Sequence, residues 1–236
     1  RLVGPVWRGL LFAVPVNLIV FYCIDFYWQA LVSFVLVATV IWTTLEDIYE
    51  KTRNTTLRAG LKRLKLSYWS MQVAHLGMLI MVIGVTGVSL YSNERDVLMV
   101  IGSEPTSIGN YSATLTKVDT LEGPNYRSSM GEVVFYQKNE PNQEEAFTEV
   151  ARLSPEKRFY FAREAVMTEA AMWVNIWSDL YVALGDQVDE DRWAVRLHFK
   201  PMIRWVWGGA FIMALGGLMA ARSGRRKEAA DDAIQV

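Results

Sequence analysis

Three stretches of this sequence, 9–45, 68–90 and 202–221, are apolar over lengths that suit a lipid bilayer better than the core of a soluble domain. A helix needs about 20 apolar residues to cross the hydrocarbon layer. The first stretch is long enough for two such helices. A single buried helix there would leave the Asp25 carboxylate in mid-membrane, where it would need a partner. The sequence therefore predicts four spans, at roughly 9–24, 28–45, 68–91 and 202–221.

The charges between these spans are distributed unevenly. The loop 46–67 carries six Lys or Arg and three Asp or Glu, whereas 92–201 carries 11 basic and 18 acidic residues, a net charge of −7. Loops on the cytoplasmic side are enriched in Lys and Arg. We therefore expect the start of the chain, 1–8, the basic loop and the tail, 222–236, to lie in the cytoplasm. Residues 92–201 are then on the opposite side.

The segment 92–201 is long enough to form a domain of its own. It consists of short runs rich in Val, Tyr, Phe and Thr, separated by Gly-, Pro- and Asn-containing turns such as KNEPNQ at 138–143. The run 193–199 alternates strictly between apolar and polar residues, which is typical of a half-buried strand. Residues 162–174 are ambiguous between a strand and a short helix. The predicted fold is an α-helical membrane protein with four transmembrane helices and one inserted all-β domain, a sandwich or small barrel.

Several function classes find no support in the composition. The net charge is −1, which gives no signal for nucleic acid binding. Cys23 is the one cysteine, so the chain has no dithiol, no zinc ribbon and no CxxCH haem attachment motif. Asn125–Arg127 is expected to be a plain turn, and His198 a solvated surface histidine. No catalytic residue is assigned. Because the sequence begins with Arg, we interpret it as a fragment or as one product of a split gene.

His75 is the candidate functional residue, because it is the one ionisable side chain inside the third span. Ionisable groups within spans are rare and usually functional. At 100° per residue, Met78, Leu79 and Val82 share its face. A neutral imidazole there could ligate haem iron, relay protons or hydrogen-bond to another helix. The glycines of this span lie on the opposite side, where they would let a neighbouring helix approach closely; they are Gly77, Gly84 and Gly87.

Six stretches, spread over most of the chain in order and spacing, resemble the C-terminal region of the CcmF family of membrane haem lyases. Related haem lyases specific to nitrite reductase, such as NrfE, share the pattern. The stretches are SYWSMQVAHLG (67–77), YSNERDV (91–97), EGPNYR (122–127), MTEAA (167–171), DLYVALGD (179–186) and WAVRLHFKPMIRWVWGG (193–209).

The resemblance implies a role in cytochrome c maturation in the bacterial inner membrane, with 92–201 in the periplasm. Such lyases take haem from a periplasmic haem chaperone and assist its attachment to apocytochrome c. They also hold a haem b between two helix histidines, and the histidine of the AHLG motif, here His75, is one of these ligands. Further implied partners are the thiol-reducing and apocytochrome-binding maturation subunits, the missing N-terminal part of the same lyase and the lipid bilayer.

The second haem ligand and the tryptophan-rich haem-handling motif of the family are absent from this sequence. His198 is a poor substitute, because a periplasmic residue would lie at least about 20 Å from His75 across a hydrocarbon layer of roughly 30 Å. The family typically has an aromatic residue at this position. We therefore expect the second axial ligand to come from outside this chain.

Two other functions fit parts of the sequence. A transporter or permease subunit would use His75 as a proton relay, but it should carry further ionisable residues within its spans. Asp25 and Arg204 are the candidates, and both are near span ends. A non-catalytic membrane-anchored scaffold would bind no chromophore.

Overall fold

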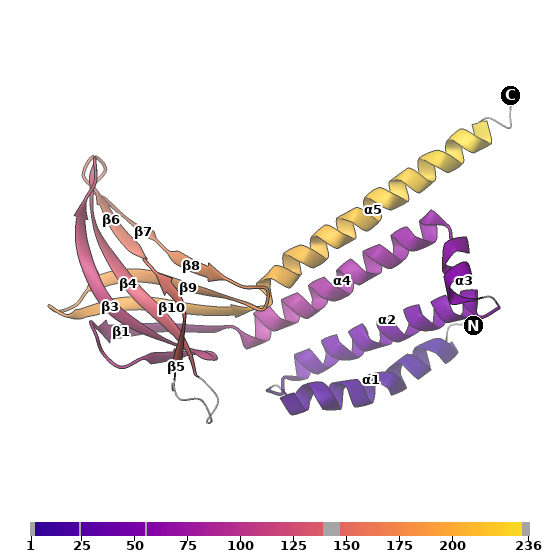
Figure 1. The fold of residues 1–236 in the computed structure, drawn as a ribbon, viewed down its shortest axis with the longest axis horizontal. Coiled ribbons are helices and arrows are strands. Elements are labelled where there is room, and N and C mark those ends of the chain that lie inside the picture. The colour runs from indigo at the N-terminus through magenta and orange to yellow at the C-terminus, as the bar shows by residue number, and fades with distance from the viewer. Residues whose placement is uncertain (1–2, 24, 55, 139–146, 233–236) are drawn as a thin grey trace. The chain divides into compact units, whose positions relative to one another are not determined.

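The computed structural model describes residues 3–23, 25–54, 56–138 and 147–232. Residues 1–90 and 202–236 form a helical unit, and residues 91–201 form a β unit (Figure 1). The turn expected at 138–143 lies outside the described residues, apart from its first residue. The chain therefore leaves the helical unit once, builds the β unit, and returns.

The first two helices, α1 (Val3–Cys23) and α2 (Trp28–Thr52), form an antiparallel hairpin. Arg8 of α1 pairs with Glu46 of α2 at 2.7 Å, and the rings of Phe12 and Trp42 lie 5.0 Å apart. Both helices run further than the apolar stretches that predicted them. The single-helix alternative for 9–45 is wrong, because residues 25–27 are not helical.

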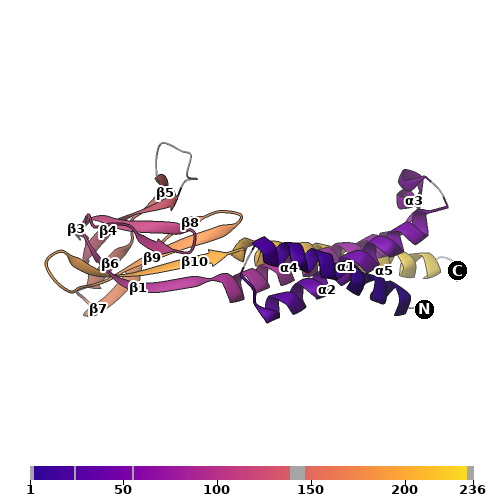
Figure 2. The ribbon, with the colours of Figure 1, turned by 90° about the horizontal axis from the view of Figure 1, so that it is seen from below.

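A short helix, α3 (Leu57–Arg63), joins the end of α2 to the start of α4 (Leu66–Tyr91) (Figure 2). It lies in the basic loop and makes a close contact with the end of α2. A Cβ atom on Gly60 would come within 2.7 Å of the Thr52 Cβ. Glycine therefore lets α3 rest directly on the end of α2.

The last helix, α5 (Ile203–Asp232), follows Met202, whose backbone is left-handed with a φ of +56°. Within the described residues, four helices are long and apolar enough to cross a membrane. This finding confirms the membrane part of the predicted fold. The candidate spans are Gly4–Tyr22, Trp28–Thr52, Leu66–Tyr91 and Ile203–Gly224.

The β unit is a sandwich of two antiparallel sheets, as one of the two predicted architectures requires. One sheet has the strand order β1-β10-β9-β8, and the other has β2-β3-β4-β6-β7, with β5 also paired to β4. The strands are β1 (Asn93–Val100), β2 (Thr106–Ile108), β3 (Tyr111–Glu122), β4 (Tyr126–Lys138), β5 (Phe147–Leu153), β6 (Glu156–Tyr160), β7 (Ala165–Glu169), β8 (Ala171–Val174), β9 (Ser178–Gln187) and β10 (Arg192–Pro201).

The core of the β unit comes from the inward-facing side chains of both sheets. In β10, the apolar residues of the alternating run are buried or packed against the core, as their period of two predicts. The ambiguous stretch at 162–174 forms β7 and β8 rather than a helix. One of these strands belongs to each sheet, so the stretch joins the two layers of the sandwich. The largest fully buried side chains of this core include Phe135, Ile108, Leu115, Leu180, Leu184 and Leu197.

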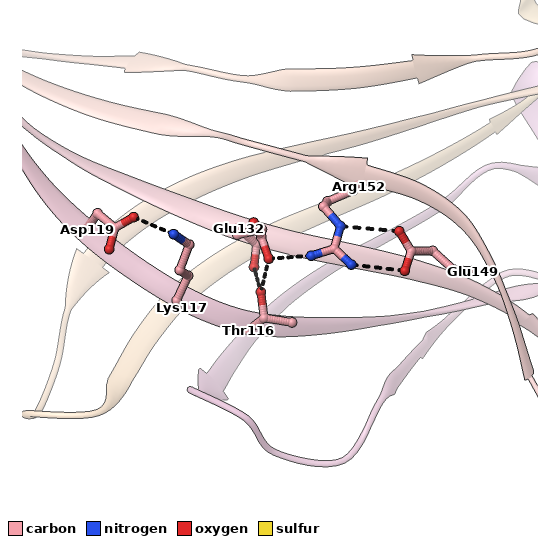
Figure 3. Close-up of polar contacts among 6 residues, drawn as sticks. All are labelled: Thr116, Lys117, Asp119, Glu132, Glu149 and Arg152. Carbon is pink, nitrogen blue, oxygen red and sulfur yellow. Dashed lines mark hydrogen bonds and ion pairs between the residues drawn. The ribbon is translucent and has the colours of Figure 1, made fainter.

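The outer face of the six-stranded sheet carries a ladder of charges (Figure 3). Arg152 on β5 binds Glu132 on β4 at 2.7 Å and Glu149 at 3.0 Å. Thr116 on β3 donates a hydrogen bond to Glu132 at 2.8 Å. The hydrogen bond from Thr116, followed by the charge of Arg152, lowers the pKa of the Glu132 carboxyl. These contacts fix side chains on a solvated surface and assemble no catalytic group.

Candidate functional site around His75

The glycine face of α4 packs directly against α5. A Cβ atom on Gly84 would lie 2.7 Å from the backbone nitrogen of Val206, and one on Gly77 would meet the backbone of Met213. From the α5 side, a Cβ atom on Gly209 would lie 2.6 Å from the carbonyl oxygen of Gly77. No side chain larger than hydrogen fits at these positions without moving a helix. The glycine contacts therefore fix the rotation of α4 about its axis.

His75 lies on the opposite face of α4, and its side chain is half-buried. Two neighbours on this face are more deeply covered, since Gln72 is 9% exposed and Leu79 is 8% exposed. One turn separates each of them from His75, which places the three side chains in a row. The imidazole is thus held on an apolar helix face that the α4–α5 contact leaves available.

A polar chain ties this face to α2. The Tyr68 hydroxyl donates a hydrogen bond of 2.7 Å to the Asp47 carboxylate, and the Lys51 ammonium lies 4.8 Å from the centroid of the Tyr68 ring. The Gln72 side chain, one turn further along α4, interacts with the Tyr68 phenol. Because the phenol gives its proton to Asp47, its oxygen can only accept from the Gln72 amide nitrogen.

This arrangement leaves the Gln72 carbonyl oxygen, Oε1, buried and without a hydrogen-bond partner among the described residues. Sequence reasoning gave His75 as a candidate and did not single out Gln72. The available signal was its position three residues before the histidine, on the same helical face. A glutamine there looks like an ordinary polar residue near a span end, and its burial depends on neighbouring helices.

The residues of this face fit one side of a haem. A neutral imidazole is an axial ligand for haem iron, and ligating histidines almost always donate their second ring N–H to a nearby acceptor. Gln72 offers such an acceptor one turn away, and Leu79 offers apolar surface. No group of three or more His, Cys, Asp or Glu within the described ranges could hold a metal ion. The helical unit therefore presents a single imidazole rather than a complete ligand set.

His198 lies in the β unit and differs from the expectation of a solvated histidine. Its side chain is only 16% exposed, with Nδ1 3.4 Å from the Glu94 carboxylate. Its ring packs edge-on against Tyr181 of the neighbouring strand, with centroids 5.0 Å apart. Burial lowers the pKa of the imidazole, and the Glu94 charge partly opposes this shift. The expectation was wrong because a cross-strand tyrosine covers the polar face.

Two other features of the β unit have structural explanations. Asn125–Arg127 completes the β3–β4 hairpin, where the Gly123 N–H donates to the Tyr126 carbonyl at 2.8 Å. Residues 123–125 form the turn, whereas Tyr126 and Arg127 already belong to β4, so the expected plain turn holds for Asn125 alone. A groove of about 540 Å³ beside β9 and β10 includes Arg196 in its lining. The Arg196 guanidinium is already held by both Asp96 oxygens, at 2.6 and 2.9 Å.

Comparison with known proteins links both units to one family. The profile described as CcmF C-terminal beta-sandwich matches residues 90–201. The chain is 40% identical over 197 residues to the cytochrome c-type biogenesis protein CcmF of Pseudomonas aeruginosa, covering 84% of this chain and 29% of that protein. It is 39% identical over 153 residues to the Escherichia coli CcmF, covering 65% of this chain and 22% of the relative.

Two further similarities extend this result. The cytochrome c-type biogenesis protein NrfE of Haemophilus influenzae is 29% identical over 83% of this chain and 28% of its own length. The solved structure of a cytochrome c haem lyase CcmF has the same fold, with a TM-score of 0.60 at 18% identity, over 89% of this chain and 33% of that one. The chain thus spans less than a third of the length of the curated relatives described here.

Proposed function

We propose that this chain is the C-terminal part of a membrane haem lyase. The chain belongs to the CcmF/NrfE family of cytochrome c-type biogenesis proteins and forms a C-terminal region of it. In this role the complete lyase takes haem from a periplasmic haem chaperone and assists its covalent attachment to apocytochrome c. The chain would supply one axial ligand of a haem b and a docking domain. The N-terminal part of the lyase would supply the remaining haem-handling residues.

His75 is the proposed axial ligand. The observation that carries this assignment is its position on α4, on the face opposite the glycine contacts with α5. Because those contacts fix the helix rotation, they also fix the face of α4 on which the imidazole lies. Leu79 would cover part of the porphyrin face and keep water from the iron. The bound haem would supply one-electron chemistry, and its second axial ligand would come from outside this chain.

We assign the β unit to docking. It carries the net charge of −7 of residues 92–201 and contains no metal-ligand cluster in its described part. Candidate partners are the haem chaperone, apocytochrome c, and the thiol-reducing and apocytochrome-binding maturation subunits. The charge asymmetry supports a periplasmic position for this unit and a cytoplasmic position for both termini of this bacterial inner-membrane protein. A reporter after Val236 should behave as cytoplasmic and one within 138–143 as periplasmic; the same side for both would refute this orientation.

The haem assignment is tested by replacing His75 in the complete lyase. His75→Ala should remove most of the haem per mole of protein and stop cytochrome c maturation, because one coordinate bond to iron is lost. Added imidazole should restore part of the haem by entering the vacated space. The matched control is His198→Ala, which should keep its haem. A reduced pyridine-haemochrome spectrum identifies haem b.

The alternative roles of His75 give other patterns in the same assay. A proton relay predicts normal haem and lost turnover in His75→Ala. A histidine that only hydrogen-bonds to another helix predicts that His75→Gln is tolerated, because an amide can still donate and accept. Normal haem content in the His75→Ala variant would overturn the ligand assignment.

A further inference from the structure

The face of α4 that carries His75 also carries a buried hydrogen-bond acceptor, the side-chain carbonyl of Gln72. Gln72 is 9% exposed, and its Oε1 has no hydrogen-bond partner among the described residues. Leaving a buried carbonyl oxygen unpaired is unfavourable. This oxygen lies three residues from His75 on the same helix face. Its position suggests that it gains a hydrogen-bond partner when haem binds.

The orientation of this amide depends on Tyr68, which lies one turn before Gln72 on α4. The Tyr68 hydroxyl donates to Asp47 on α2 at 2.7 Å, so the Tyr68 oxygen is left as an acceptor toward the neighbouring Gln72 amide. Turning the amide over would place two oxygens against each other at Tyr68. The chain from Asp47 through Tyr68 therefore keeps Oε1 as the free end of the side chain.

An imidazole bound to iron through one nitrogen carries its proton on the other. That N–H needs an acceptor, which orients the ring and makes the ligand more basic. Side chains three residues apart on a helix are neighbours. We propose that Gln72 is a positioning residue for the axial ligand, with its Oε1 accepting the hydrogen bond from the His75 ring N–H. This inference rests on the proposed function of His75.

The test compares two Gln72 variants of the complete, haem-loaded lyase. Gln72→Leu removes the acceptor and fills the buried position with an apolar side chain. It should raise the haem reduction potential, because a less basic ligand stabilises ferric iron less well. Haem transfer to excess apomyoglobin should become roughly 10- to 100-fold faster, as with other lost partners of metal ligands. Gln72→Glu should shift the potential downward, because a carboxylate accepts more strongly.

Two controls separate this role from simple packing. Thr86→Val changes another buried residue of the same face, which is 5% exposed and donates to the Val82 carbonyl. Thr86 lies about 16 Å along the helix from His75, so the haem reduction potential and the haem transfer rate should not change. Tyr68→Phe breaks the anchoring chain but keeps Oε1, so its shift should be smaller than that of Gln72→Leu.

An unchanged potential and transfer rate in Gln72→Leu would overturn this inference, even if His75→Ala loses its haem. If His75→Ala keeps its haem, the proposed function itself fails. If Gln72→Leu folds poorly, the Gln72→Glu variant provides the test. A haem reduction potential of Gln72→Glu equal to or above that of the unsubstituted protein would overturn the proposal.

Discussion

The two units of this protein bury their apolar residues in opposite ways. In the β unit, Phe135 is fully buried between two sheets, and so are Leu115 and Leu180. In the helical unit, large apolar side chains point outward; Trp207 is 73% exposed and Phe211 is 66% exposed. The β unit therefore has a core of its own. The helical unit instead relies on lipid and on further protein to cover its surface.

The two units are also held together by different forces. The β unit is stabilised by removing apolar area from water. Helices in lipid gain little from this effect, because hydrocarbon tails are as apolar as leucine, and they associate through close backbone packing instead. The glycine contacts between α4 and α5 are this second kind of interaction. Substitutions should therefore have different consequences in the two units.

The largest effect is expected where the two membrane helices touch. Gly209→Leu should strongly lower the amount of folded protein, because its side chain would collide with the backbone of Gly77 and Met81. Gly84→Leu should do the same from the other helix. The matched control is Gly208→Leu, since a Cβ atom at Gly208 has nothing within 4 Å. Detergent-extracted protein is measured by size-exclusion chromatography; equal yields of the Gly209 and Gly208 variants would contradict the packing argument.

Next in size is the loss of a core phenylalanine. Phe135→Ala should lower the free energy of unfolding of the β unit by about 3–5 kcal/mol, the range for large-to-small changes in a packed core. Phe211→Ala, at an exposed position in α5, should leave the free energy of unfolding of the β unit unchanged. Denaturant unfolding of the full chain, followed by hydrogen exchange in each unit, measures both. A similar loss in both variants would remove the distinction between the units.

A smaller effect should appear with pH at His198. Its pKa is lowered by burial in the folded β unit, so the unfolded chain binds the proton more readily. Stability from this group is fully present above its ordinary pKa of about 6.5 and falls as pH drops through that value toward the lowered one. Glu94 and Asp96 oppose the shift, whereas Arg196 and Lys200 reinforce it. His198→Phe should abolish this step between pH 7.5 and 5, and an unchanged step would assign it to another group.

The smallest effect is expected on the charge ladder of the outer sheet face. The lowered pKa of Glu132 means that the Glu132 carboxylate stabilises the folded β unit above the ordinary carboxyl pKa of about 4.3. This stabilisation is lost as pH falls below that value. Glu132→Gln should reduce the acid sensitivity of the β unit slightly, and 1 M salt should reduce the difference further by screening. A salt-insensitive difference would indicate that the ladder acts through packing rather than charge.

Much of this architecture follows from local patterns in the sequence. Spans of apolar residues predicted the four membrane helices, because the bilayer thickness sets their length. The strict alternation at 193–199 predicted which side chains of β10 face the core. The helical period predicted a glycine face opposite His75 on α4. Each inference needed only the repeat of one element, which neighbouring residues determine.

Other features depended on elements far apart in the chain. The sequence could not show that α5, more than 110 residues after α4, is the helix that packs on Gly77 and Gly84. It could not show that Tyr181 covers His198, because cross-strand register is set by the whole sheet. Nor could it show that the Gln72 oxygen is buried without a hydrogen-bond partner among the described residues. Periodicity gives the face on which a side chain lies, whereas its burial and its partners depend on which element packs against that face.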